Sequence, residues 1–297
     1  MAGYIVYNGF WNPDAPPSVV VRLAAAAKQR GMALTLIANT GAVAEIIGGE
    51  VHVGAMSERD FALFWDKDVR LARAMERIGT RLYNCADAVA VCDDKAATHL
   101  ALSGTGILMP DTLVAPMTYV HMDIEQSVLF VRRCEAALGF PMVVKECYGS
   151  LGGQVYLAKN EMELRELAGR MDARPFLCQR YIAAAHGVDV RVYVVGGVSV
   201  AAMKRRSDCD FRANIGNGGH GEVYSPTQEE LNIAVESCRV LGLDFGGVDL
   251  ITDGDGRPML CEVNASAHME ELERCTGADV AGAIVDYVFL RESNFER

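Results

Sequence analysis

The chain has 297 residues, of which 51% are hydrophobic, and a formal net charge of −11. This length and composition can bury a large core and build two or three subdomains, which excludes a disordered chain. The acidic balance argues against a general nucleic-acid-binding protein, because such a protein needs a basic surface to displace counterions.

The cysteines and the N-terminus predict a cytoplasmic protein. Nine cysteines are scattered without a C-x-x-C pair or a cysteine–histidine cluster, so we interpret them as reduced core residues. The segment from Met1 to Tyr7 lacks a basic region followed by a long apolar run, and no apolar stretch is long enough to span a bilayer. We therefore expect neither a membrane partner nor a nucleic-acid partner.

The first part, residues 1–94, is predicted to be an α/β domain that begins with a βαβ unit. The predicted strands are residues 5–7, 34–37, 61–65 and 84–91, and the predicted helices are residues 19–29 and 69–78. The segment Asp66-Lys67-Asp68 fits an N-cap of the second helix, although strand ends in such sheets also point at ligands.

The second part, residues 95–180, is predicted to be a connector followed by a small α+β lid. Lys95 lies at the start of a connector helix, where alone it would be a solvated helix end, and a proline-containing loop follows at residues 110–116. In the lid, two helices flank a hairpin. The predicted helices are residues 127–138 and 161–171, and the hairpin strands are residues 140–145 and 154–157.

A glycine loop joins the two hairpin strands directly after Lys145. Gly149, Gly152 and Gly153 allow backbone N–H groups to approach phosphate oxygens, and the lysine adds a point charge. The loop leads into a strand and not a helix, so it is neither a Walker P-loop nor a Rossmann fingerprint. Taken alone, such a segment is more often only a hairpin.

The third part, residues 181–297, is predicted to be a second α+β subdomain that carries a metal site. It contains a long strand pair, a glycine-rich loop at residues 216–221, a helix at residues 227–241, a second strand pair and a final helix at residues 279–290.

The second strand pair places three oxygen ligands close together. Glu262 and Asn264 are two residues apart and project to the same face, and a hairpin partner can place Asp249 beside them. Mg²⁺ takes hard oxygen ligands and keeps part of its water shell for phosphate. We predict a magnesium site in preference to a plain hairpin with polar ends, because carboxylates are rarely buried without a cation.

The order of Lys95, Lys145, the glycine loop and the three oxygen ligands resembles the ATP-grasp fold, and more closely the RimK-like carboxylate-amine ligases. The resemblance covers about residues 83–289. It implies an α/β fold, α+β in parts, in which an N-terminal βαβ domain precedes a lid and a C-terminal subdomain that hold ATP between them.

Further motifs carry this resemblance. The segment from Gln179 to Ile182 looks like the hinge that binds adenine through its backbone, and Asp189, within Gly187 to Arg191, matches the aspartate that holds the ribose. The ATP-binding residues that the resemblance implies are Lys95, Lys145, Gly149, Ser150, Gly152, Gly153, Gln179, Arg180, Tyr181, Ile182, Asp189, Arg191, Arg212 and Asn214.

The catalytic residues that the resemblance implies are Arg205, Arg212 and Asn214. Strand alternation aims Arg205 opposite to Lys204 and Arg206, so only one face of this basic triplet serves the site. Arg212 and Asn214 belong to an F-R-x-N loop. The glycine-rich loop that follows either closes over the site and excludes water or is a flexible turn.

Two segments depart from the family pattern. Arg180 replaces an acid, which concerns the side-chain part of adenine recognition and not the backbone part. Ala267-His268-Met269 replaces a Pro-Gly-Leu segment on the substrate side, which indicates a different acceptor. His268 is either an acceptor-binding or proton-accepting group or a structural histidine.

The implied chemistry is ATP-driven amide formation. A carboxylate attacks the γ-phosphate to give an acyl phosphate and ADP, and an amine then displaces phosphate, with Mg²⁺ as the metal and Mn²⁺ able to substitute.

The implied partners are a small-molecule, peptide or carrier-protein carboxylate and an amino acid such as glutamate; a homo-oligomer is left open. The alternatives are a D-alanine:D-alanine-type ligase, which the D-x-R and F-R-x-N segments disfavour, and an inactive ATP-binding module.

Overall fold

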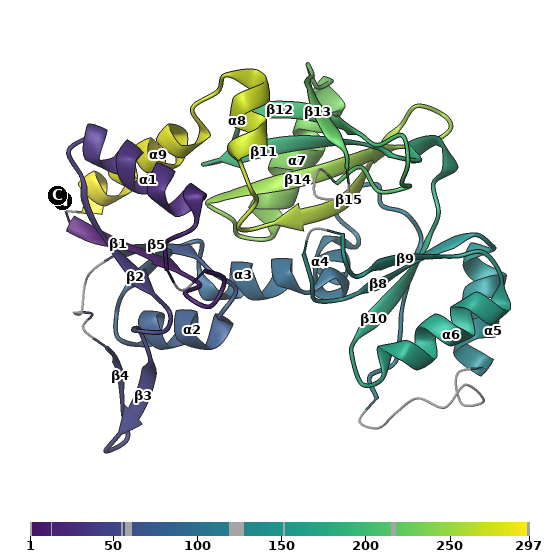
Figure 1. Cartoon of the computed structure of the whole chain (residues 1–297), viewed down its shortest axis with the longest axis horizontal. Coiled ribbons are helices and arrows are strands. Elements are labelled where there is room, and N and C mark those ends of the chain that lie inside the picture. Colours follow the sequence, from purple (N-terminus) through teal and green to yellow (C-terminus); the bar gives the residue numbers. More distant parts are fainter. Residues whose placement is uncertain are drawn as a thin grey trace.

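The computed structural model of the chain describes residues 2–12, 14–54, 56, 61–118, 128–150, 152–214 and 218–295 (Figure 1). The N-terminal part and the lid lie at opposite ends of the molecule, and the C-terminal sheet lies between them. The predicted mixed α/β class is confirmed. Three predicted features, Ser127, Leu151 of the glycine loop and the start of the second glycine-rich loop, lie outside the described residues.

The N-terminal part is built on a parallel sheet with the strand order β2-β1-β5-β6. Parallel neighbours need crossover connections, which α1 supplies between β1 and β2 and α2 supplies between β5 and β6. A two-stranded hairpin, β3–β4, projects from this part. Its elements are β1 (Ala2–Tyr7), α1 (Ser18–Gln29), β2 (Ala33–Ala38), β3 (Ala44–Ile47), β4 (Glu50–Val53), β5 (Phe61–Trp65), α2 (Val69–Arg77), β6 (Arg81–Tyr83) and α3 (Ala86–Asp93).

One predicted strand of this part is wrong. Residues 84–91 were expected to form a strand, but α3 occupies residues 86–93 and the short β6 ends the sheet before it. The segment is rich in alanine, which has the highest helix propensity, and Ala86, Ala88, Val89 and Cys92 bury one side of the helix. A short apolar run of this kind suits a helix as well as a strand.

The lid has an antiparallel sheet with the strand order β7-β10-β8-β9, covered by two helices. The predicted helix at residues 161–171 is observed at the same bounds, and the predicted loop at residues 110–116 contains the short strand β7. The connector helix and the lid elements are α4 (Lys95–Leu102), β7 (Thr112–Val114), α5 (Val128–Leu138), β8 (Met142–Glu146), β9 (Val155–Ala158), α6 (Glu161–Met171) and β10 (Phe176–Arg180).

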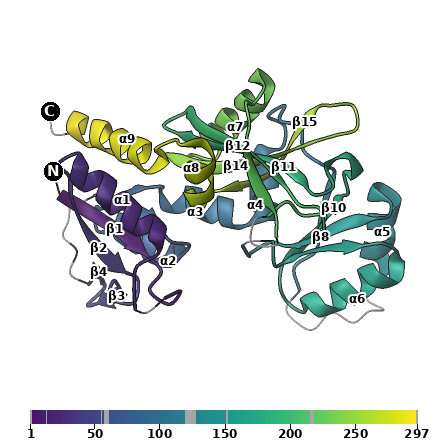
Figure 2. The ribbon, with the colours of Figure 1, turned by 45° about the horizontal axis from the view of Figure 1, so that its top comes forward.

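The C-terminal part has a five-stranded antiparallel sheet with the order β13-β12-β11-β14-β15. Helix α9 leaves this sheet, returns to the N-terminal part and packs on α1, where Arg30 pairs with Asp286 at 2.6 Å (Figure 2). The elements are η1 (Ala183–Ala185), β11 (Val188–Val195), β12 (Val198–Arg206), β13 (His220–Val223), α7 (Gln228–Val240), β14 (Phe245–Thr252), β15 (Pro258–Asn264), α8 (Glu270–Thr276) and α9 (Val280–Phe295). No helix in the described part of the chain is long and apolar enough to cross a membrane.

The hydrophobic cores do not follow the three parts one to one. Two cores contain residues of both the N-terminal part and the C-terminal sheet, such as Phe64 with Val192 and Ile5 with Tyr193. The lid instead has a core of its own around Phe176. The N-terminal and C-terminal parts are therefore joined by apolar packing, and the lid is packed separately.

Candidate functional site

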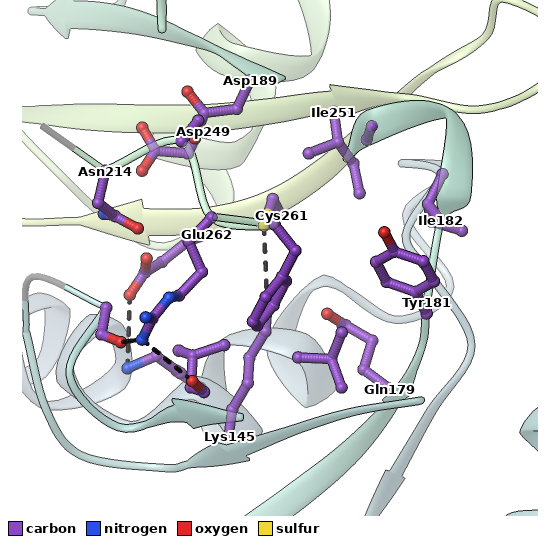
Figure 3. A pocket seen from close by; sticks show the side chains of 18 of the residues that line it. Lys145, Gln179, Tyr181, Ile182, Asp189, Asn214, Asp249, Ile251, Cys261 and Glu262 are labelled. Atoms are coloured by element: carbon purple, nitrogen blue, oxygen red, sulfur yellow. Dashed lines mark hydrogen bonds and ion pairs between the residues drawn. The ribbon is translucent and has the colours of Figure 1, made fainter. Parts of the chain in front are cut away.

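Two adjoining cavities contain almost all residues that the sequence singled out. The lid cavity lies between the lid and the C-terminal sheet (Figure 3). The predicted residues that line it are Lys95, Lys145, Gly149, Ser150, Gly152, Gln179, Arg180, Tyr181, Ile182, Asp189, Arg205, Arg212, Asn214, Asp249 and Glu262.

The N-terminal cavity lies between the N-terminal part and the C-terminal sheet and has a volume of about 690 Å³. It contains the two predicted residues Arg191 and Asn264, and it shares Ser150, Arg205, Asn214 and Glu262 with the lid cavity. Of the predicted site residues, Gly153 lines neither cavity. The shared residues lie at the junction where the two cavities adjoin.

The strand pair β14–β15 places the predicted metal ligands as expected. Asp249 lies directly opposite Glu262 in the register, and Gly247 lies opposite Asn264. Cross-strand neighbours share a face of the sheet, so the two carboxylates and the amide project together. The described residues contain no cluster of three or more His, Cys, Asp and Glu side chains that would suit a metal. The mixed set of two acids and one amide is therefore the candidate.

Asp249 is buried and held by two arginines. Arg191 donates from Nε to Oδ1 and from Nη2 to Oδ2, both at 2.7 Å, and Arg205 Nη2 lies 2.9 Å from Oδ2. Burial alone would raise the pKa of Asp249, but the two guanidinium groups outweigh it and lower this pKa to about 2. These contacts use three of about four lone-pair sites of the carboxylate, so one remains for a cation.

The two predicted lysines approach the acids from different elements. Lys95, at the start of α4, lies with Nζ 3.4 Å from Glu262 Oε1 and donates to the carbonyl of Gly149 at 3.3 Å. Lys145, on β8, donates to Cys261 Sγ at 3.7 Å (Figure 3). The lysines thus join the glycine loop and the lid strand to the edge of the metal strand pair.

Cys261 is a cavity residue that the sequence did not reveal. Alternation along β15 would turn it away from the face of Glu262, but the register shifts between Asp249 and Leu250 and leaves Cys261 as an extra residue. Such a bulge re-aims a side chain, and Cys261 lines the lid cavity together with Glu262. Burial raises the pKa of the Cys261 thiol.

Arg212 connects the C-terminal part to the lid. Its guanidinium donates to both oxygens of Asp210 and, from Nη1, to the carbonyls of Gly152 at 2.5 Å and Val155 at 3.2 Å. The hydrogen bonds to Asp210 raise the pKa of Arg212, so it is a fixed cation above the glycine loop. Its partners in the loop are carbonyl oxygens, which a phosphate oxygen can replace.

The hinge segment, residues 179–182, begins with the last two residues of β10 at the end of the lid. The side chain of Gln179 contacts Thr112 Oγ1 at 2.9 Å and His99 Nε2 at 3.2 Å. Burial, with a smaller effect of Lys145, lowers the pKa of His99 to about 4, so this ring is neutral near pH 7. The guanidinium of Arg180 bonds Asp111 and the carbonyls at the end of α5, so any part of Arg180 in ligand binding falls to its main chain.

Asp189 is the second residue of β11, close to a glycine that the fold requires. Gly187 has a φ of +67°, and an added Cβ would lie 2.3 Å from the carbonyl oxygen of Ser207. Asp189 accepts two hydrogen bonds of 2.6 Å from Arg205, which also contacts Asp249. Arg205 is therefore the buried arginine of its strand, while Arg206 pairs with Glu222 on the other face. The predicted orientation of Arg205 is the observed one.

The residues of the N-terminal part that line the N-terminal cavity were not predicted as site residues. They include Asn8, Trp11, Trp65 and Lys67, and Asp93 joins them from the end of α3. The only signal in the sequence was the position of Asp66-Lys67-Asp68 at a strand end. His268, left open by the sequence, lines the same cavity with its Nδ1 3.7 Å from Glu270.

The comparisons of this chain with known proteins all point to the same family. The RimK-like ATP-grasp domain model matches residues 92–288. Human beta-citrylglutamate synthase B is 36% identical over 225 residues, which are 75% of this chain and 56% of that protein. The "Probable alpha-L-glutamate ligase" of Methanococcoides burtonii is 36% identical over 219 residues, or 73% of this chain and 69% of that protein. The chain spans about half the length of the first curated relatives that it matches, 54% and 56%.

Solved structures show the same fold over the whole chain. The ATP-grasp ligase PsnB complexed with a minimal precursor superposes with a TM-score of 0.73 at 19% identity and covers 98% of this chain and 100% of that one. A RimK domain protein from Sphaerobacter thermophilus gives a TM-score of 0.71 at 21% identity and covers 96% of this chain and 98% of that one. At these identities the likeness establishes the fold.

Proposed function

The chain belongs to the RimK-like ATP-grasp family, and from this premise we propose that it is an ADP-forming ligase that joins a carboxylate to an amine, with an amino acid such as glutamate as the amine. The observation that carries the proposal is the junction of the two cavities. Ser150, Arg205, Asn214 and Glu262 line both, so a nucleotide in the lid cavity meets a second substrate in the N-terminal cavity.

The lid cavity suits ATP. Lys95, Lys145 and Arg212 supply three cations around the glycine loop and its carbonyls, where a triphosphate would lie. The hinge from Gln179 to Ile182 would receive the adenine, and Asp189 would receive the ribose. The side chain of Arg180 takes no part, so the departure from the family pattern at this position leaves the backbone recognition of adenine intact.

Asp249, Glu262 and Asn264 fit Mg²⁺, and Mn²⁺ is expected to substitute. Two carboxylates and an amide on one face of a strand pair are the hard oxygen donors that this ion takes, with room left for water and phosphate. When bound, the metal would neutralise negative charge on the transferred phosphoryl group. Arg191 and Arg205 hold Asp249 ionised and correctly oriented beforehand.

The carboxylate of the acceptor would attack the γ-phosphate, which releases ADP and leaves an acyl phosphate; the amine would then displace phosphate. Arg205 and Arg212 would stabilise the negative charge that develops on the acceptor. The human relative is named for a citryl product and another human relative for N-acetylaspartylglutamate. Small carboxylates of this kind, and peptides or carrier proteins with such a group, are the acceptors that we propose.

The test is a measurement of nucleotide products with pairs of substrates. We expect ADP and phosphate to form when citrate, N-acetylaspartate or a glutamyl peptide is offered with L-glutamate, and mass spectrometry to detect the amide. A pair of D-alanine molecules in the same panel tests the D-alanine:D-alanine-type alternative. AMP as the stoichiometric product would refute the acyl-phosphate route, and absence of turnover with every pair would favour an ATP-binding module.

A further inference from the structure

The N-terminal cavity lies at a special place in the parallel sheet. Strands β1 and β5 are neighbours in the middle of the sheet. The crossover through α1 runs from β1 outward to the edge strand β2, and the crossover through α2 runs from β5 outward to the opposite edge strand β6, so the two connections lead in opposite directions. Ligands of open α/β sheets bind outside the carboxyl ends of the strands at such a switch point. Asn8 follows β1, Asp66 and Lys67 follow β5, and all three line the cavity.

The structure separates the roles of the three charged residues after β5. Asp68 is the N-cap of α2, where its side chain accepts from the N–H of Leu71. Asp66 is buried, and its Oδ1 accepts hydrogen bonds from Asn8 Nδ2 and from the backbone of Lys67. Burial raises the pKa of Asp66. The side chain of Lys67 extends instead toward Ser150 of the glycine loop and Asp93 at the end of α3.

The ammonium group of Lys67 lies at the junction of the two cavities. Nζ donates to Ser150 Oγ at 3.1 Å and pairs with Asp93. Ser150 belongs to the glycine loop and lines both cavities, whereas Lys67 and Asp93 line the N-terminal cavity alone. Because an ammonium group has three donors, these two contacts leave one hydrogen for a ligand.

The arginines of the N-terminal cavity are paired as well. Arg191 and Arg205 are buried against Asp249, and Arg22 and Arg274, whose side chains are 49% and 70% exposed, pair with acids of α8. The side chain of Lys67 is 44% exposed, and an ion pair of such an exposed lysine is worth little. An anionic ligand can therefore replace Asp93 at small cost.

From this geometry we propose that Lys67 binds an anionic group of the acceptor substrate and, through Ser150, couples its arrival to the position of the glycine loop over the nucleotide. Lys67 lies outside the residues matched by the family model, so it is a specificity residue that the N-terminal part adds to the shared machinery. The inference rests on the proposed ligase function for the identity of the acceptor.

The ordinary alternative is a structural ion pair between Lys67 and Asp93. The two interpretations predict different signs for the changes in acceptor binding when each charge is removed. If the pair is structural, removal of either charge has the same effect on the enzyme. If Asp93 competes with the substrate for Lys67, then Lys67→Met weakens acceptor binding and Asp93→Asn strengthens it, because the second change frees the lysine and removes a repelling charge.

The experiment compares steady-state kinetics of these two variants with citrate and N-acetylaspartate as acceptors. We expect Lys67→Met to raise the KM for the acceptor tenfold or more with the KM for ATP changed less than threefold, and Asp93→Asn to lower the acceptor KM. Lys28→Met, an exposed lysine on α1, is the matched control and should leave both constants unchanged. Changes of the same sign in Lys67→Met and Asp93→Asn would overturn the proposal.

A second arm needs no turnover and separates this inference from the proposed function. Hydrogen exchange of the glycine loop is followed with Mg-ADP, with and without citrate. We expect citrate to slow exchange in the unaltered chain, and to have no such effect in Lys67→Met or in Ser150→Ala. An equal slowing in the unaltered chain and in Lys67→Met, or no slowing in any of them, would overturn the coupling even if ligation is observed.

Discussion

The lid and the N-terminal part contact the C-terminal sheet in different ways. The N-terminal part shares two hydrophobic cores with that sheet. The lid has a core of its own, meets the connector helix α4 through a small apolar cluster of Ala96, Cys147 and Leu177, and contacts the C-terminal part through polar groups such as Arg212. Interior packing transmits strain, and small interfaces do not. We therefore expect the N-terminal and C-terminal parts to behave as one rigid half, against which the lid can move.

Asn84 shows how this rigid half is joined. The residue is fully buried, and its amide donates to the carbonyls of Phe245 and Ala265 and accepts from the N–H groups of Asp244 and Phe245. It thereby connects the N-terminal part to the start of β14 and to Ala265, the residue that follows Asn264 at the end of β15. From this comparison we infer that the rigid half would fix the proposed metal ligands and the N-terminal cavity, while the lid would carry Lys145 and the glycine loop.

The largest expected effects come from the two acids of the strand pair β14–β15, where one substitution should affect turnover alone and the other both turnover and stability. Glu262 is partly exposed at the lid boundary, so Glu262→Gln should lower turnover by roughly a hundredfold or more and leave the melting temperature unchanged. Asp249→Asn should abolish turnover and also destabilise the fold by about 3 kcal/mol, because it leaves Arg191 and Arg205 buried with less counter-charge. Kinetics and thermal melts check both, with Glu236→Gln on α7 as the control. Parent-like turnover of either variant with Mg²⁺ would refute the metal assignment.

Much of this site could be predicted from the sequence because its residues lie on regular elements. Strand period places Glu262 and Asn264 on one face and turns Arg205 away from Arg206, and pairing within a hairpin can add Asp249; these placements are observed. The order of Lys95, Lys145 and the glycine loop along the chain then matches the order of motifs in the family, which assigns them to the same predicted site. Local rules suffice where a side chain is positioned by its own strand.

The rest depended on tertiary structure. Cys261 enters the cavity through a bulge that no pattern announces, and residues 84–91 were assigned to a strand because short apolar runs suit either element. Lys67 becomes a site residue only because two parts distant in sequence face each other across a cavity. Contacts between residues far apart in sequence leave no periodic signal.

The difference between the two halves can itself be tested with one substitution in each. Leu164→Ala in the lid core should cost about 2–5 kcal/mol, and Asn84→Ala should cost at least about 2 kcal/mol because it leaves buried backbone groups unpaired. We expect hydrogen exchange to rise only in residues 128–180 for Leu164→Ala, and in both β1–β6 and β14–β15 for Asn84→Ala. Equal exchange of β11–β15 in the two variants would show that the lid is not a separate unit.

The smallest expected effect concerns the contact that joins the two halves across the lid cavity. Arg212 binds the carbonyls of Gly152 and Val155 in the lid and has a planar fork that can hold two phosphoryl oxygens, whereas a lysine offers one compact charge. Arg212→Lys should therefore keep the KM for ATP and lower kcat roughly tenfold, or about 1.4 kcal/mol. Arg206→Lys, on the opposite face and paired with Glu222, is the matched control and should keep its kcat. If kcat of the Arg212 variant also stayed unchanged, Arg212 would be a structural residue held by Asp210 and the lid carbonyls, and the lid would close over the nucleotide without a contact from it.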